Sequence, residues 1–578
     1  MKMMKKIVTL FLVCLMLVTI AACNKSNDNN NNAGSETSAG NNAGESPGNN
    51  TSGDNSNVGA NNNSAANNSD NSAGANGGAN ISGGNNGDVG SSGVISEGIV
   101  SARDTITIAT SGDSGTLLAS QMMGSFVGVA RQYMEVLVDF AADGSPIWEL
   151  ATNIEEVSAS QWIIHCREGV TFSNGSKFDA HDVWFTFDRY VNDARGNFFL
   201  SCFDLDNSKI VDDYTIDLAL SSYSVQQMGS LCQIYILDAE TFNEDDFVLH
   251  PVGTGPYVVT EYVTNSHVYL KARDDYWGGK PLIENVHYKV INEDSQVING
   301  IEAGSLDVAA VPSQEREYVK SMSGFDVLEY YTVFTPTISF NMNEVSIMNN
   351  LDARLAICFA TDRQAIINMA YFGYGDVAGY PVSTHCYDYE PRLANLHPTY
   401  SVGKDLDLAR EYAEKAGIVG KDIIAITNGS SAFVTTAEVL QANLKEIGVN
   451  LIINNYDGAT YMTVASDPTT HDITLYAVAS PQCLAVGQLY EYVMWGAANY
   501  ATWENFDAYM AMGAAAVAET DMAKRSDALY DMSVMFMDAT PWYAIGDMTG
   551  AVAIASDLGG VEIWNSGGMR FKTWYWLS

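Results

Sequence analysis

The sequence predicts an α/β fold, and three features support that prediction. Apolar residues make up 47% of the 578-residue chain, enough to build buried cores in two or three domains. Segments that alternate polar and apolar side chains, as strands do, are interspersed with segments of helical periodicity. No segment is repeated. This pattern is typical of sheets covered by helices, here with additional antiparallel strands.

The first elements follow directly from these patterns. Residues 105–110 (TITIAT) alternate strictly and are expected to form a strand. Helices are expected over 126–140 and 180–190. Asp179 stands where it can cap the second helix, and Asp182 can complete a capping box with it.

Later elements show the same alternation. We expect a strand over 286–291 and helices over 351–371 and 406–416. A helix over 437–447 then leads into a strand over 449–453, which is the helix-to-strand order of an α/β unit.

The N-terminus has the parts of an export signal. Basic residues precede an apolar run, residues 7–22, which is too short to span a bilayer. The run ends in Ile-Ala-Ala before Cys23 and resembles the lipobox of bacterial lipoproteins, in which the cysteine becomes the first residue and is lipidated. We expect a signal peptide at 1–22 and a lipid anchor on Cys23, holding the protein at the extracellular face of the cell membrane.

Residues 23–98 are dominated by Asn, Gly, Ser and Ala and have almost no large apolar side chains. Such a segment cannot bury enough surface to offset the entropy of ordering, so a disordered tether is expected. The formal charge of −40 disfavours a nucleic-acid partner, because phosphate binding needs a basic surface. The six cysteines beyond Cys23 form no C-x-x-C pair, and disulfides and buried thiols are equally open.

Several motifs, in order along the chain, resemble the family 5 extracellular solute-binding proteins of ABC importers, which include oligopeptide-, dipeptide- and nickel-binding types. The resemblance extends from about residue 104 to the C-terminus. Its motifs are EVLV at 135–138 with DGSP at 143–146, CREGVTFSNG at 166–175, FDAHDV at 178–183, PVGTGPY at 251–257, DYWG at 275–278, AGSLD at 303–307, DAR at 352–354 and ATDR at 360–363.

This resemblance implies a two-lobed clamshell of the periplasmic-binding-protein type that closes on its ligand. Lobe I is expected at 99–331 with an extra subdomain at about 148–250, lobe II at 332–547, and a return to lobe I at 548–578. It also implies a monomer that delivers its ligand to the permease subunits of an ABC importer. The ligand is expected to be a small polar molecule, with a short peptide as the leading class.

The resemblance also guides the choice of candidate ligand-binding residues. Peptide-binding relatives pair the ligand's amino group with an aspartate after a second-lobe strand, but residues 478–483 (VASPQC) contain no acid. Aromatic walls remain available for stacking, although each aromatic could equally pack in a core. The candidates are Asp113, Ser114, Tyr461, Tyr476, Ser480, Gln482, Trp495, Trp542 and Tyr543.

Other functions remain as alternatives. The missing aspartate favours an oligosaccharide receptor of the same fold, and a sensory or adhesive role would use the same clamshell. An exported hydrolase is disfavoured, because no nucleophile elbow lies outside the tether and no zinc motif occurs. GTG at 253–255 lacks the remainder of a phosphate loop, and the eight histidines lack metal-ligand spacing, so no cofactor or metal is expected.

Overall fold

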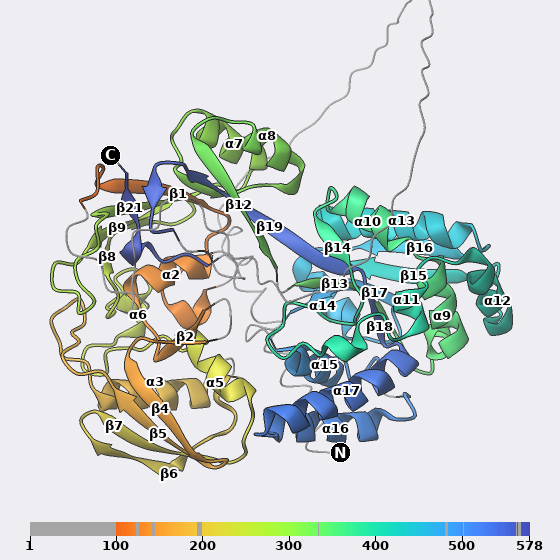
Figure 1. The fold of residues 1–578 in the computed structure, drawn as a ribbon, viewed down its shortest axis with the longest axis horizontal. Helices are drawn as coiled ribbons and strands as arrows, with labels where there is room; N and C mark the ends of the chain where they lie inside the picture. The colour runs from red at the N-terminus through yellow and green to blue at the C-terminus, as the bar shows by residue number, and fades with distance from the viewer. Residues whose placement is uncertain are drawn as a thin grey trace, which may run out of the picture. The chain divides into compact units, whose positions relative to one another are not determined.

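A computed structural model describes residues 100–577, apart from 123–125, 142–144, 194–198, 333, 480–483, 501, 562 and 564–567. The predicted signal peptide, Cys23 and the tether lie outside the described residues. The described chain is built around three sheets of four or more strands, with helices packed beside them (Figure 1). The predicted α/β class is confirmed.

The largest sheet has eight strands. Its central strand β1 runs parallel to β10 and β11, whereas β8, β9, β12, β14 and β19 join through antiparallel pairs. The strands are β1 (Thr105–Thr110), β8 (Tyr257–Val263), β9 (His267–Ala272), β10 (Asn285–Val290), β11 (Val308–Ala310), β12 (Phe325–Tyr331), β14 (Gly375–Val377) and β19 (Gly546–Ala555).

A five-stranded sheet follows in the order β16-β15-β17-β13-β18. β15 is parallel to β16 and β17, and β13 is antiparallel to β17 and β18. The strands are β13 (Thr335–Phe340), β15 (Asp422–Thr427), β16 (Asn450–Asn455), β17 (Ile473–Val478) and β18 (Trp542–Ala544).

The remaining strands form an antiparallel four-stranded sheet and two short ribbons. The four-stranded sheet contains β4 (Ala151–Ser158), β5 (Gln161–Cys166), β6 (Phe203–Asp212) and β7 (Thr215–Leu220). The ribbons pair β2 (Val138–Phe140) with β3 (Pro146–Trp148), and β20 (Leu558–Gly559) with β21 (Tyr575–Trp576).

Helices of very different lengths cover these sheets. They are α2 (Val127–Tyr133), α3 (Ala180–Asn192), α5 (Gln226–Ser230), α6 (Glu244–Phe247), α7 (Asp294–Glu302), α8 (Arg316–Lys320), α9 (Leu351–Ala360), α10 (Arg363–Ala370), α11 (Pro398–Ser401), α12 (Leu406–Ala416), α13 (Ser431–Lys445), α14 (Gly458–Ala465), α15 (Ala485–Trp495), α16 (Phe506–Ala518) and α17 (Met522–Ala539).

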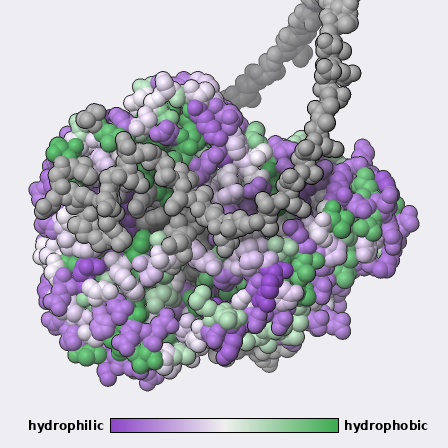
Figure 2. Space-filling view, viewed as in Figure 1, coloured by the Kyte–Doolittle hydropathy of each residue, from purple (hydrophilic) through white to green (hydrophobic). Residues whose placement is uncertain are grey.

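Each large sheet has its own apolar core. Ile106, Ile108 and Val286 belong to the core of the eight-stranded sheet, and Ile423 and Leu475 to that of the five-stranded sheet. A third cluster fills the four-stranded sheet. On the visible face of the described chain, hydrophobic residues occur in small groups among hydrophilic ones (Figure 2), as expected of a water-exposed surface.

The predicted helix at 180–190 is α3, and Asp179 and Asp182 form the expected capping box. Two helix predictions were too long. The helix predicted over 126–140 ends at Tyr133, because Met134 is extended and the chain then enters strand β2. The helix predicted over 351–371 breaks after Ala360, where Asp362 caps the new helix α10.

Apart from the short strand β14, which pairs with the start of β19, two connections carry the described chain between the two largest sheets. β12 pairs with β19 in the eight-stranded sheet, and the next strand, β13, belongs to the five-stranded sheet. The return path runs from β18 through Ile545 into β19, the long strand drawn between the two groups of elements in Figure 1. These two crossings and the β14–β19 pair connect the elements built on one large sheet to those built on the other.

Candidate functional site

The parallel strands of both large sheets end in polar loops. Residues 111–115 follow β1, and residues 428–430, 456–457 and 479 follow the parallel strands β15, β16 and β17. In open α/β sheets, ligands bind beyond the carboxyl ends of the parallel strands. These two loop clusters and the crossings between them are therefore the candidate ligand site.

Asp113 lies in the loop after β1, but both of its carboxylate oxygens are already used. Oδ1 accepts hydrogen bonds from the hydroxyl of Tyr262 at 2.7 Å and from the amide of Gly115 at 2.8 Å. Oδ2 accepts from the amide of Asn265 at 2.5 Å. Asp113 therefore holds the shape of its loop, and Ser114 beside it is half-buried.

Tyr476 and Tyr461 both lie at the five-stranded sheet. Tyr476 projects from β17 and stacks on Tyr492 of α15, with ring centroids 6.0 Å apart and 17° between the ring planes. The Tyr492 hydroxyl accepts a hydrogen bond from the amide of Ala479 at 3.0 Å and so fixes the start of the loop after β17. Tyr461 is buried, and its hydroxyl donates to the carbonyl of Leu475 at 3.0 Å.

Three other predicted residues fall at or beyond the limits of the described structure. Ser480 and Gln482 lie outside the described residues. Trp495 is the last residue of α15, and its side chain lies outside what the structure describes. Asp388 caps the start of this helix, accepting hydrogen bonds from the amides of Ala485 and Val486. Burial raises the pKa of Asp388, partly offset by these hydrogen bonds.

Trp542 and Tyr543 lie in the core of the five-stranded sheet, at 1% and 0% exposure. The indole of Trp542 donates to the carbonyl of Pro381 at 2.8 Å, and the Tyr543 hydroxyl donates to the carbonyl of Thr399 at 2.8 Å. Trp542 and Tyr543 were predicted as ligand contacts, but in the structure both side chains pack in the core. Segments that include Pro381 and Thr399 cover them.

Asp547, the second residue of β19, is a polar residue at this position that was not among the predicted contacts. β13 begins at Thr335, opposite the last residue of β17, and its other partner β18 ends at Ala544. Because β19 begins at Gly546, it starts just beyond the carboxyl edge of the five-stranded sheet. Further along β19, Val552 pairs with Ala310 of β11, and Ala310 is level with the carboxyl end of β1. Asp547 therefore lies beyond the carboxyl edges of both sheets.

The surroundings of Asp547 combine donors and rings. Its Oδ2 accepts hydrogen bonds from the Thr384 hydroxyl at 2.6 Å and the Thr384 amide at 3.2 Å. Across the β14–β19 pair Asp547 stands opposite Asp376, which accepts a hydrogen bond from the Tyr331 hydroxyl at 2.8 Å. This hydrogen bond raises the pKa of Tyr331. The Tyr331 ring stacks on the ring of His385, with centroids 3.7 Å apart.

Segments built on different sheets also touch away from the crossings. The Tyr387 hydroxyl donates to the carbonyl of Ala141 at 3.2 Å. The amide of Val225, just before α5, donates to the carbonyl of Val517 in α16 at 2.8 Å. Close by, burial raises the pKa of Glu491 in α15 to about 7. The structure is therefore held together at more points than the two crossings.

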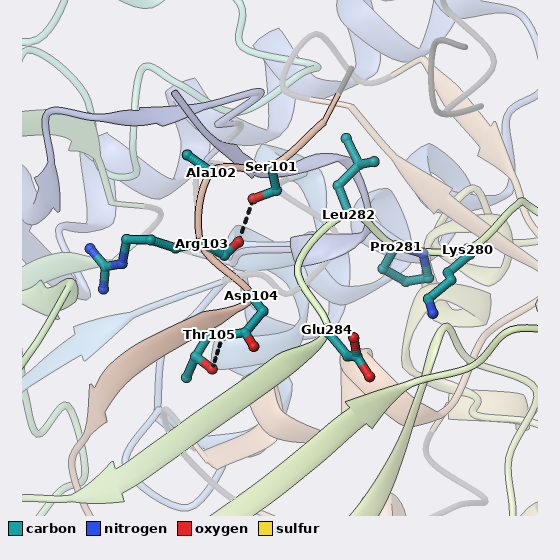
Figure 3. Close-up of a pocket in the computed structure, with 9 residues that line it drawn as sticks. All are labelled: Ser101, Ala102, Arg103, Asp104, Thr105, Lys280, Pro281, Leu282 and Glu284. Carbon is teal, nitrogen blue, oxygen red and sulfur yellow. Dashed lines mark hydrogen bonds between the residues drawn. The ribbon is translucent and has the colours of Figure 1, made fainter. Parts of the chain in front are cut away.

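Two surface hollows are lined by residues remote from the carboxyl-edge loops. One, of about 500 Å³, is lined by residues 101–105, 280–282 and 284 at the amino ends of β1 and β10. In Figure 3 the Arg103 side chain points away from Lys280 and Glu284. The other, of about 620 Å³, lies on the four-stranded sheet around Cys166 and Asp213.

The described ranges also bear on metal binding, membrane spans and disulfides. There, no group of three or more His, Cys, Asp or Glu side chains is placed to hold a metal ion. No helix in this part of the chain is long and apolar enough to cross a membrane. Cys166, Cys202 and Cys358 form no disulfide, and burial raises the pKa of the Cys166 thiol to about 12.

Comparison with known proteins gives consistent matches. Residues 145–518 match the bacterial extracellular solute-binding proteins, family 5. The ABC transporter periplasmic-binding protein SapA of Escherichia coli is 24% identical over 64% of this chain and 70% of its own length. The oligopeptide-binding protein AppA of Bacillus subtilis is 24% identical over 52% of this chain and 60% of its own length.

Solved structures share the fold. The substrate-binding protein CtaP of Listeria monocytogenes superposes with a TM-score of 0.72 at 19% identity, covering 82% of this chain and 100% of that one. Bacillus subtilis AppA in complex with a nonapeptide gives 0.68 at 18% identity, covering 82% and 99%. Brucella suis NikA in complex with Fe(III)-EDTA gives 0.73 at 20% identity, covering 82% and 99%. The predicted two-lobed architecture is confirmed by these neighbours.

Proposed function

This chain belongs to the family 5 bacterial extracellular solute-binding proteins, and from that premise we propose that it captures a short peptide for an ABC importer. The observation that carries the proposal is the position of the polar loops and aromatic pairs at the carboxyl edges of two sheets that crossing strands and surface contacts connect. Peptide ligands also occur among the relatives, as in the AppA complex with a nonapeptide.

Contacts among side chains near these edges support the proposed site. The stacked pairs Tyr476–Tyr492 and Tyr331–His385 supply flat apolar surface, and Asp547 supplies charge. Ser114, Ser480, Gln482 and Trp495 remain proposed contacts. We place lobe I at 99–331 with its subdomain at about 148–250, lobe II at 332–547 and the return at 548–578.

An oligosaccharide receptor is the second candidate, because stacked aromatic pairs also suit sugar rings. Family 5 proteins bind substrates rather than transform them, and we propose that this chain has no catalytic activity. We further propose that residues 1–22 are a lipoprotein signal peptide, that Cys23 carries the lipid, and that residues 23–98 tether a monomer to the outer face of the membrane.

Thermal-shift screening tests the ligand class. Libraries of short peptides, oligosaccharides and metal ions would each be added to the mature protein without its lipid. A true ligand at a hundredfold excess over Kd stabilises the folded state by about 2.7 kcal/mol through mass action. We expect peptides to raise Tm. A rise with oligosaccharides alone would replace the peptide proposal by the second candidate, and a rise with metal ions alone would contradict both.

A further inference from the structure

Besides the two strand crossings, residues 371–377 reach from one large sheet to the other. Helix α10 packs in the core of the five-stranded sheet, but the chain then leaves that core, and β14 pairs with β19. It returns at once, because the amide of Ala378 donates to the carbonyl of Ile545 and both residues lie in the same core as α10. A movement of one large sheet relative to the other must therefore bend or displace residues 371–377.

This segment begins with a sharp bend. Phe372 and Gly373 have φ angles of 56° and 83°, in the left-handed region. Glycine adopts these angles freely, whereas a phenylalanine there is strained and needs surroundings that hold it. The Phe372 side chain is 52% exposed, so its own packing supplies little of that hold. The bend is held from its two ends instead: the Gly373 amide donates to the carbonyl of Ile367 on the helix side, and Tyr374 is bound on the other.

Tyr374 is attached to helix α8, which lies beside β12 (Figure 1). The guanidinium carbon of Arg316 is 3.8 Å from the centre of the Tyr374 ring, and the Tyr374 hydroxyl donates to Glu317 Oε1 at 2.9 Å. The Tyr374 carbonyl accepts a hydrogen bond from the amide of Thr549 in β19 at 3.3 Å. Val319 of α8 is buried in a cluster with residues of β11 and β19. Ring, hydroxyl and backbone of Tyr374 are thus all bound on the side of the eight-stranded sheet.

Arg316 also connects the two crossing strands. Its side chain is 1% exposed and donates to the hydroxyl of Thr549 at 2.9 Å, to the Thr549 carbonyl at 2.8 Å and to Glu329 of β12 at 3.3 Å. Thr549 stands opposite Tyr331, the last residue of β12. These contacts therefore lie where β12 ends and β19 begins to pair with it. A planar guanidinium can donate through its edge and stack through its face, so one residue holds both strands and Tyr374.

Burial decides which contact dominates this attachment. Lys320 forms ion pairs with Glu317 and Glu329 beside the ring, but these three side chains are 35–76% exposed. Exposed ion pairs contribute little to stability, because water screens them. A cation over an aromatic ring is attracted more strongly when it is desolvated, as the buried Arg316 is. The stacking of Arg316 on Tyr374 is therefore the main link.

We propose that Arg316 and Tyr374 form a hinge clip, a pair of positioning residues that fixes the pivot about which the two large sheets move. The clip keeps residues 374–377 with the eight-stranded sheet, so that bending is confined to Phe372, Gly373 and the two strand crossings. Without it the segment would follow α10, and the pivot would lose one of its fixed points. The clip acts whichever ligand class the protein captures, so it goes beyond the proposed function.

Hydrogen exchange measured by mass spectrometry tests the attachment on the mature protein without lipid or ligand. Tyr374→Ala should speed amide exchange at 373–377 and 546–549 about threefold to thirtyfold, the range that loss of one partly desolvated cation–π contact implies. Exchange in β1 and β17, which lie in the two separate cores, should stay at the wild-type rate. That local pattern separates a hinge clip from a residue that only stabilises the fold.

A distance measurement tests the pivot itself. Spin labels on ketone-bearing residues introduced at Ala159 and Glu414, both exposed, would avoid the native cysteines. Ala159 lies in the turn between β4 and β5, and Glu414 lies on α12. The distribution of label-to-label distances should be broader in Tyr374→Ala than in the protein with an intact clip, because the two sheets then move about a less fixed axis.

Three further variants sharpen both measurements. Tyr374→Phe keeps the ring and should behave like wild type, since it loses only a hydrogen bond to an exposed glutamate. Tyr318→Ala is the matched control: this tyrosine of α8 is 48% exposed and also donates its hydroxyl to a glutamate, but to Glu302 of α7. It should leave both measurements unchanged. Arg316→Lys keeps the charge without the planar face and should resemble Tyr374→Ala.

Several results would overturn the inference. Wild-type exchange at 546–549 in Tyr374→Ala would show that the ring does not hold β19, and equal acceleration in both cores would show a purely structural role. An unchanged distance distribution would exclude the pivot. Loosening in Tyr374→Phe equal to that in Tyr374→Ala would place the hold in the hydroxyl and not in the contact with Arg316. If Arg316→Lys does not fold, the Tyr374 variants decide alone. None of these measurements involves a ligand, so they leave the peptide proposal to its own test.

Discussion

At the scale of single residues, Trp542 shows why an aromatic near a predicted site is hard to assign. Its indole touches the carbonyl of Pro381 and packs edge-on against Phe536, with ring centroids 4.3 Å apart. Neither partner adjoins Trp542 in the sequence. Because Pro381 is 161 residues away in the chain and Phe536 lies on the preceding helix, composition and local pattern leave the environment of Trp542 open.

Trp542→Ala is expected to destabilise the protein by about 3–5 kcal/mol, the usual cost of removing a large core aromatic. The lost indole also leaves the Pro381 carbonyl without its donor. The drop appears as a lower Tm, while the folded fraction keeps its ligand affinity. Phe334, which is 54% exposed, provides the control, and Phe334→Ala should leave Tm nearly unchanged. An unaltered Tm in Trp542→Ala would show that the indole is not part of the core.

Asp547, in contrast, left a signal in the sequence. It is the single acid within the run TPWYAIGDMTGAVAIA at 540–555, which is otherwise free of charge. A charge inside an apolar strand is costly and therefore calls for an explanation. What the sequence could not supply is the cross-strand partner, because β14 reaches β19 only through the folded structure.

At the scale of elements, predictions based on local chemistry were the most accurate. The capping box of α3 lies within four neighbouring residues, and the structure has it as predicted. The helix expected over 126–140 failed, because apolar residues from Val136 to Val138 fit a buried strand as well as a helix. Pairing with β3 decides between the two, and periodicity alone cannot detect that pairing.

The glycines of the turn at 253–255 are required by close packing and not by unusual backbone angles. Gly253 and Gly255 do not have positive φ angles. They are needed because helix α2 ends against them: a Cβ on Gly253 would lie 2.0 Å from the carbonyl oxygen of Tyr133. The amide of Gly255 donates to the same carbonyl at 3.0 Å.

Gly253→Ala should therefore destabilise the protein by about 1–3 kcal/mol, the range for overpacking against a rigid backbone. The midpoint of urea unfolding measures the change. Gly128, within α2 itself, is the matched control because its added Cβ meets nothing within 4 Å. Gly128→Ala should leave stability unchanged or raise it by up to about 1 kcal/mol, as helix propensity predicts. Equal effects of the two variants would contradict the close-approach argument.

At the scale of the whole molecule, the anchor can be tested independently of the ligand. Cys23→Ser removes the thiol that would carry the lipid, without touching residues 100–577. The variant is expected in the soluble fraction of cells or in the medium, since one protein body without acyl chains has little to hold it to a bilayer. Fractionation and immunoblotting measure the shift, and the Tm should equal that of the unlipidated wild-type body. A variant that stays with the membrane would contradict the lipoprotein assignment.

The contact between α15 and the α5 region predicts a pH dependence of the whole molecule. Glu491 interacts with Gln226, and burial raises its pKa from 4.5 to about 7. Nearby, burial also raises the pKa of Glu156, which faces Tyr223 and Arg525. Both shifts have the same sign, because each carboxyl loses water when the segments meet.

The sign of the effect follows from proton binding. Between pH 4.5 and about 7, Glu491 keeps its proton while α15 contacts the α5 region, and it would lose that proton if the two segments separated and the carboxyl became solvated. The contact between α15 and the α5 region is therefore favoured at low pH and weakens as the pH rises through this window. In the absence of ligand, the radius of gyration from solution scattering should increase from pH 5 to pH 8. Glu491→Gln cannot ionise and should flatten that increase, whereas an identical pH profile in the variant would show that other groups control the contact.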